Sequence, residues 1–115
     1  MKIYSRRYEN KVQLEEITSD WTTNDSENKY WLVCTKDGGG SDQTIVLDSS
    51  SAPKNVYIIQ NERPSSYYVS VEVASGEYLN GVEDGYNIIE AGETWMVSND
   101  GNGKWWGFSM TNVSG

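Results

Sequence analysis

The stretch at residues 67–75, YYVSVEVAS, decides the fold class of this chain. Its three valines, Val69, Val71 and Val73, alternate with polar residues, so in an extended strand they point to one side and the polar side chains to the other. β-branched residues favour extended backbone, and alternation of this kind indicates that only one face is buried. The stretch therefore predicts a half-buried β-strand.

Similar apolar runs, separated by turn residues, follow one another along most of the chain. The turns contain Asp-Gly, Asn-Gly or Pro-Ser pairs at intervals of roughly 8–12 residues, and after residue 28 no segment keeps helical periodicity. This pattern predicts an all-β fold, an antiparallel β-sandwich or small barrel. The runs are 29–36, 43–49, 54–62, 67–75, 78–79, 86–89, 94–99 and 104–110. The first two flank a glycine-rich breaker and are predicted to form a hairpin.

The first 28 residues are less regular. Val12 and Leu14 alternate as in a strand, whereas Leu14, Ile17 and Trp21 also have helical spacing, and we favour extended structure. The polar tract 19–28 predicts a loop. The predicted division is an N-terminal arm and loop at 1–28, which is an attachment segment, and a β-sandwich domain at 29–115.

Charge is distributed unevenly along the chain. The net charge is −8, but residues 1–12 sum to +3, which leaves −11 for the remaining 103 residues. The charged residues of this arm are Lys2, Arg6, Arg7, Lys11 and Glu9. An acidic body repels phosphate backbones, so we expect no nucleic-acid partner. The arm either docks on an acidic protein surface or a neighbouring copy, or is simply solvated.

Several classes of protein are disfavoured by what the sequence lacks. Charges interrupt the apolar residues of the first 11 positions, so no secretory leader is expected, and no apolar run approaches the roughly 20 residues of a membrane-spanning helix. We expect synthesis in a cytoplasm and no membrane insertion. The single cysteine, Cys34, lies in an apolar run and is predicted to be a small buried hydrophobic residue.

The sequence contains few residues that could catalyse a reaction or bind a metal ion. The chain has no histidine, which removes the commonest general base and metal ligand. A carboxylate pair drawn from Glu83, Asp84, Glu90 and Glu93 is the remaining route to hydrolysis, but these acids flank turns, where they are commonly solvated. The Asp-Gly-rich loops at 37–42 and 100–103 are explained by turn chemistry without calcium. We expect no enzyme activity, no metal and no cofactor.

Aromatic residues indicate binding more directly. The chain has five Trp and eight Tyr, and the consecutive Trp105 and Trp106 must face opposite sides of a strand. Outward rings such as Trp31, Tyr68 and Trp106 can stack on a sugar or fill a contact between subunits. We favour the subunit contact, because so much aromatic area on a small monomer would leave large exposed patches.

The order of these motifs resembles the β domains of tailed-bacteriophage fibre, head-fibre and capsid decoration proteins. The resemblance covers residues 44–108, from TIVLDSSSAPKNVYIIQN through VSVEVASGEYLNG and NIIEAGETWMVSNDG to GKWWGF. The matching positions are Asn61, Val69, Val71, Val73, Leu79-Asn80-Gly81, Ile88-Ile89, Ala91-Gly92-Glu93, Asp100-Gly101 and Trp105-Trp106. Such domains often form trimers and work without catalysis. The chain lacks the shaft repeats of a long fibre, which favours a capsid ornament.

The resemblance and the opposed charges together predict a non-enzymatic virion protein, made in the host cytoplasm. We expect a homotrimeric capsid decoration or short head-fibre protein, attached to a capsid or tail protein through its basic aromatic arm. The attachment residues are Ile3, Tyr4, Arg6, Arg7 and Tyr8. The alternative is a tail-fibre tip or a module that binds a receptor or a host surface glycan, with Trp31, Tyr68 or Trp106 in a shallow groove.

Overall fold

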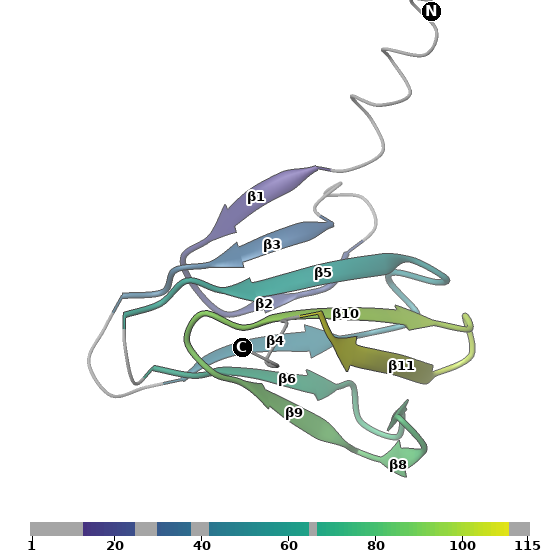
Figure 1. Ribbon diagram of the computed structural model, residues 1–115. Coiled ribbons are helices and arrows are strands. Elements are labelled where there is room, and N and C mark those ends of the chain that lie inside the picture. Colours follow the sequence, from purple (N-terminus) through teal and green to yellow (C-terminus); the bar gives the residue numbers. More distant parts are fainter. Residues whose placement is uncertain (1–12, 25–29, 38–41, 65–66, 111–115) are drawn as a thin grey trace, which may run out of the picture.

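The computed structural model describes residues 13–24, 30–37, 42–64 and 67–110 (Figure 1). These residues form strands and turns, with no helix among them, so the predicted all-β fold is confirmed. The strands are β1 (Leu14–Ile17), β2 (Trp21–Thr22), β3 (Trp31–Cys34), β4 (Gln43–Leu47), β5 (Val56–Asn61), β6 (Val69–Val73), β7 (Tyr78–Leu79), β8 (Val82–Glu83), β9 (Tyr86–Ile89), β10 (Thr94–Asn99) and β11 (Lys104–Ser109).

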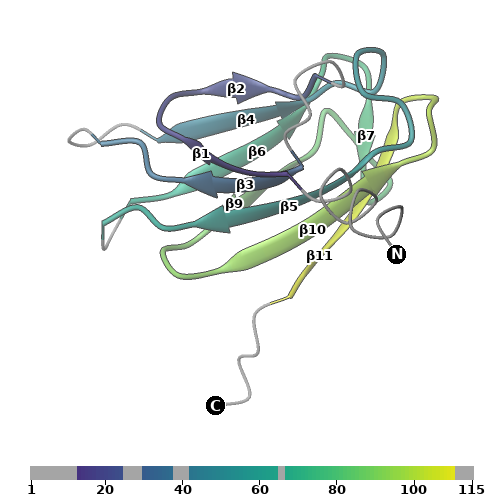
Figure 2. The same cartoon turned by 90° about the horizontal axis from the view of Figure 1, so that it is seen from above.

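The strands make two sheets that face each other across one core (Figure 2). One sheet has seven strands in the order β1-β3-β5-β10-β11-β7-β8, and the other has four in the order β2-β4-β6-β9. The first six strands alternate between the sheets. Because the chain crosses to the other sheet after each of these strands, it returns in the same direction, and β1, β3 and β5 pair in parallel, as do β2, β4 and β6.

Both sheets are therefore mixed, whereas the sequence indicated antiparallel pairing. Antiparallel pairs occur where the chain folds back later, between β5, β10 and β11, between β6 and β9, and between β7 and β8. The predicted hairpin between 29–36 and 43–49 is wrong, because β3 and β4 lie in opposite sheets. Each of these strands buries alternate residues, and such a pattern specifies an inner face without specifying the neighbouring strand.

The extended structure predicted for the start of the chain is present in β1, which pairs with β3. The loop predicted for 19–28 is wrong at Trp21–Thr22, because these residues form β2, pair with β4 and bring the Trp21 ring against the core. The segment left over for a separate arm is 1–12, which lies outside the described residues.

The core is built from the inward side chains of both sheets. Trp105 is fully buried while Trp106 is 56% exposed, so the two tryptophans face opposite sides as predicted. Val69, Val71 and Val73 are buried as well. At the centre, the Tyr57 ring lies 6.3 Å from the ring of Trp105, between centroids, and packs edge-on against Trp21 at 6.2 Å.

Three buried amide side chains hold the ends of the strands together. Gln43 donates from Nε2 to the carbonyls of Ile17 and Ser19, at 2.8 Å each, and so fixes the link between β1 and β2 against β4. Asn61 and Asn99 make corresponding bonds at the ends of β5 and β10. Crossings between sheets leave backbone carbonyls without ladder partners, and a buried carbonyl without a partner is costly, so these amides stabilise the crossings.

Candidate interaction surfaces

A row of apolar side chains crosses the outer side of the seven-stranded sheet. Leu14, Trp31, Ile58, Met96 and Phe108 are successive cross-strand partners on β1, β3, β5, β10 and β11. Directly opposed residues share one side of a sheet, so their side chains form a continuous stripe. The two ends of the row are exposed and its middle is half-buried. We call this row, with the neighbouring Val56 and Trp106, the apolar face.

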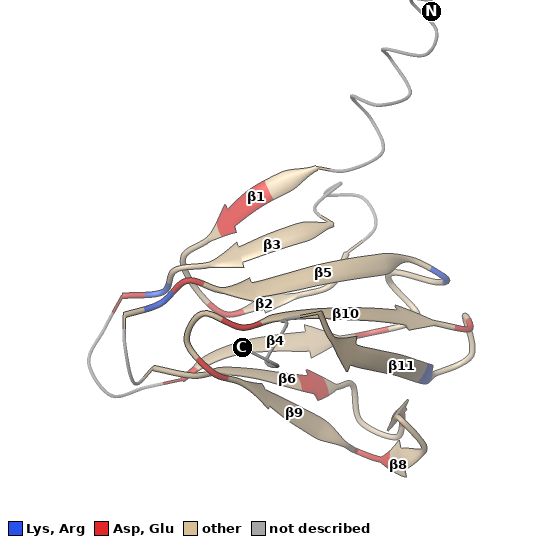
Figure 3. Cartoon of the chain, viewed as in Figure 1, with Lys and Arg blue, Asp and Glu red and all other residues tan. Residues whose placement is uncertain are grey.

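No charged side chain interrupts the middle of this surface. The outward residues of β3, β5 and β10 are Trp31, Val33, Val56, Ile58, Gln60, Thr94, Met96 and Ser98. None of them is charged, although charged residues make up 23% of the chain. Figure 3 shows the same three strands free of charge along their lengths, with Lys, Arg, Asp and Glu beyond their ends. An exposed sheet surface normally carries charge, and its absence here is typical of an interface.

The structure separates the three aromatic residues predicted to contact a ligand or a subunit. Trp31 and Trp106 both lie on the apolar face, in neighbouring rows on β3 and β11. The indole Nε1 of Trp31 donates to Oε1 of Gln60 at 3.1 Å, which fixes that ring. Tyr68 is exposed but immediately precedes β6 of the other sheet, so it does not join them. The arm residues Ile3, Tyr4, Arg6, Arg7 and Tyr8 lie outside the described residues.

Trp106 also borders a shallow hollow at the edge of the apolar face. The hollow has a volume of about 320 Å³ and is lined by Tyr78, Gly81, Lys104 and Trp106. Lys104 is the cross-strand partner of Tyr78, so an ammonium group and a phenol stand beside the exposed indole. An aromatic ring with polar groups at its border suits a sugar face.

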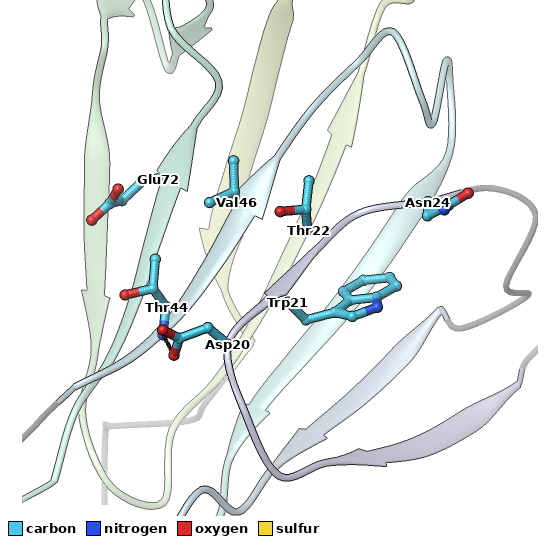
Figure 4. Close-up of a pocket in the computed structure, with 7 residues that line it drawn as sticks. All are labelled: Asp20, Trp21, Thr22, Asn24, Thr44, Val46 and Glu72. Carbon is cyan, nitrogen blue, oxygen red and sulfur yellow. Dashed lines mark hydrogen bonds between the residues drawn. The ribbon is translucent and has the colours of Figure 1, made fainter.

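The outer side of the four-stranded sheet has a different character. It carries a groove of about 550 Å³, shown in Figure 4, which we call the polar groove. Its lining is Asp20, Trp21, Thr22, Asn24, Thr44, Val46 and Glu72. Hydroxyl, amide and carboxylate groups dominate this lining, so the groove is compatible with water.

Asp20 is held in place at one end of the polar groove. Its Oδ1 accepts from the backbone N–H of Thr44 at 2.8 Å and from Nζ of Lys36 at 3.2 Å. The Thr44 hydrogen bond, with the smaller contribution of the Lys36 ammonium, holds the pKa of this carboxyl below its ordinary value of 3.8. Asp20 therefore joins the start of β2 to β4 and is already satisfied by protein groups.

Two of the four acids considered for hydrolysis, Asp84 and Glu93, accept backbone hydrogen bonds in turns. The Glu93 carboxylate accepts from the backbone N–H of Glu90 at 2.9 Å, and that of Asp84 accepts from Gly76 at 2.8 Å. Asp100 likewise accepts from Asn102 and Lys104 in the turn after β10. Among residues 13–24, 30–37, 42–64 and 67–110, no group of three or more His, Cys, Asp or Glu side chains is placed to hold a metal ion.

Two polar side chains with structural roles were not identified from the sequence, the buried Arg63 and the half-buried Glu77. Arg63, which follows the predicted run at 54–62, donates from Nε to the carbonyl of Lys36 at 3.0 Å and from Nη1 to that of Tyr68. Glu77 accepts from Trp105 Nε1 at 2.7 Å and from the hydroxyl of Ser49 at 3.1 Å. Both types are usually exposed, and only their partners, which are distant in sequence, could have identified them.

Cys34 is buried, as predicted. Burial raises the pKa of its thiol to about 12, so the thiolate is scarcely populated near neutrality.

The described fold and surfaces define an all-β protein of two mixed sheets, with an apolar outer side on the larger sheet and a polar one on the smaller. Comparison with protein-family models, curated proteins and solved structures finds no match to this chain. Within the part of the chain that the structure describes, no helix has the length and apolar character needed to cross a membrane.

Proposed function

We propose that this chain is a non-enzymatic structural protein of a phage virion, which associates with copies of itself through the apolar face. The observation that carries the association is the uninterrupted row from Leu14 to Phe108. A continuous apolar surface is unfavourable in water, and burying it against a second apolar surface lowers the free energy. The virion setting is supported by the motif order of residues 44–108.

The size of the apolar face supports an association of moderate strength. Its five strands span about 19 Å at the usual strand spacing, and with side chains the surface covers on the order of 600 Å². That is near the lower end of what specific protein interfaces bury on each partner. A homotrimer, the state typical of the domains that this chain resembles, would bring three such faces together.

Light scattering of the full chain after size exclusion, over a range of concentrations, tests the association. We expect a trimer mass that falls toward the monomer on dilution. A monomer at every concentration up to the hundreds of micromolar would contradict self-association, since interfaces weaker than this are seldom specific. Co-sedimentation with purified capsid shells and with purified tails then identifies the virion partner. Retention on neither would contradict the virion role.

A second candidate function is the binding of a host glycan at the hollow beside Trp106. It is favoured by the exposed indole next to Tyr78 and Lys104. A glycan array gives the test: binding that Trp106→Ala abolishes supports this function, and an empty array contradicts it.

A further inference from the structure

The two sheets have four open edges among the described strands, and three of them are blunted. The edge strands β2 and β8 contain only two residues each, and β1 carries Glu15 and Glu16. Short strands and charged residues are common means of preventing unwanted pairing at a sheet edge. The fourth edge, β9, has four residues, Tyr86–Ile89, and none is charged. It is the edge best suited to accept another strand.

The backbone of β9 presents hydrogen-bonding groups outward. The N–H of Val73 donates to the carbonyl of Gly85 at 3.4 Å, and the opposed residues of an antiparallel ladder alternate between bonded and non-bonded pairs. Asn87 and Ile89 therefore bond to β6, while the N–H and C=O groups of Tyr86 and Ile88 point away from it. The side chains of these two residues are exposed, by 69% and 37%.

A hollow lies on each side of Asn87 along this edge. One, of about 290 Å³, lies between β9 and the β7–β8 turn and includes Leu79, Val82 and Asp84. The other, of about 230 Å³, includes Ile89, Glu93 and Trp95. Alternate side chains of an added strand point the same way, so two of them can enter these hollows. Each hollow combines apolar walls with one carboxylate.

The part of the chain that contains β9 is strongly acidic. Between Arg63 and Lys104 the chain has no Lys or Arg. Its acids in that interval are Glu72, Glu77, Glu83, Asp84, Glu90, Glu93 and Asp100. A strand that binds this edge should therefore carry positive charge. The +3 arm of this chain, residues 1–12, meets that requirement and contains Tyr4 and Tyr8 for the apolar walls.

We propose that residues 1–12 of one copy add as a strand to the β9 edge of a neighbouring copy. This proposal rests on the proposed self-association. It differs from the sequence-based expectation in that the arm binds a neighbouring copy of the chain and not the virion shell. The arm joins the sandwich at β1, which Figure 1 shows at the opposite end of the domain from β9, so a neighbour is the natural acceptor. Such a contact is head-to-tail, and three of them can close a ring.

Photo-cross-linking in the full chain tests this assignment. Tyr8 is replaced by p-benzoylphenylalanine, and ¹⁴N-labelled and ¹⁵N-labelled copies are mixed before irradiation. We expect cross-links from position 8 to residues 83–90, joining copies of different label. Cross-links within one copy, cross-links to the apolar face, or no cross-links would each overturn the proposal.

Variants on both sides of the contact make the result specific. Ile88→Pro removes an outward N–H without removing a bond to β6, and it should abolish the cross-link, whereas Ile88→Val should retain it. The arm variant R6E/R7E changes no residue of the described strands and should lower the yield roughly tenfold. An unchanged yield in R6E/R7E would overturn the proposal even if Ile88→Pro does not fold. The cross-link reports only where the arm binds. Light scattering that shows a monomer would contradict association through the apolar face, and the two results can therefore be distinguished.

Discussion

The two sheets bury similar inner sides and present opposite outer sides. Inward, both carry aliphatic and aromatic residues, such as Leu32 and Ile59 on one and Ile45 and Val71 on the other. Outward, the larger sheet has the row from Leu14 to Phe108, whereas the smaller has the polar groove. The inner sides account for folding, so the difference outside requires another cause. The proposed function accounts for it, since it places a protein partner on one outer surface and water on the other.

The largest effect on stability should come from the two adjacent tryptophans, because Trp105 lies in the shared core and Trp106 on the apolar face. Trp105→Ala removes a fully buried ring and leaves the Glu77 carboxylate without its indole donor, so we expect the free energy of unfolding to fall by about 3–5 kcal/mol. Trp106→Ala should change it by less than about 0.5 kcal/mol. Urea unfolding measures both. Equal losses would mean that the apolar face is part of the folding core.

A charge placed on each outer side tests the comparison itself. Met96→Lys puts an ammonium group in the middle of the apolar face and should weaken self-association by roughly 100-fold, as loss of a central interface residue does. Val46→Lys, on the smaller sheet opposite Glu72, is the matched control and should leave association unchanged. Sedimentation velocity measures the dissociation constants. Equal weakening by the two lysines would show that charge alone is responsible.

A smaller effect is expected at Asp20 in the polar groove. Its pKa is lower in the folded chain than the ordinary 3.8, so its charge stabilises the fold above that pH, and this contribution is lost as the pH falls through the folded value. Because its side chain is 57% exposed, solvent screening limits the effect to less than about 1 kcal/mol. Asp20→Asn should therefore be slightly less stable at pH 7, and thermal melting should show the difference disappear as the pH falls through the folded pKa, which lies below 3.8. A difference that is undiminished well below the folded pKa would contradict the assignment.

The smallest effect is expected for the chemical labelling of Cys34, which lies in the core between the two sheets. With the pKa of Cys34 raised to about 12 by burial, iodoacetamide at pH 8 should label the native chain hardly at all and the urea-unfolded chain fully. Mass spectrometry gives the labelled fraction. Rapid labelling of the native chain would show that water reaches the core below β3.

Periodicity was sufficient for the strands and insufficient for their pairing. The alternation of Val69, Val71 and Val73 and the opposed faces of Trp105 and Trp106 follow from a two-residue repeat, which is local. The assignment of β3 and β4 to different sheets depends on which strands each of them pairs with, and the sequence of either strand alone does not specify that partner. The structural roles of Arg63 and Glu77 were missed for the same reason, because their partners come from other elements.

By itself, the sequence determined that this chain is a β protein with one aromatic core, a basic start and an acidic remainder, since composition, charge and alternation are properties of the chain. Only the tertiary structure decided that Leu14, Trp31, Ile58, Met96 and Phe108 form one row and that β9 is the open, uncharged edge. The neighbours of each strand depend on the strand order, and the strand order is fixed only when the half-buried faces of the two sheets pack together during folding.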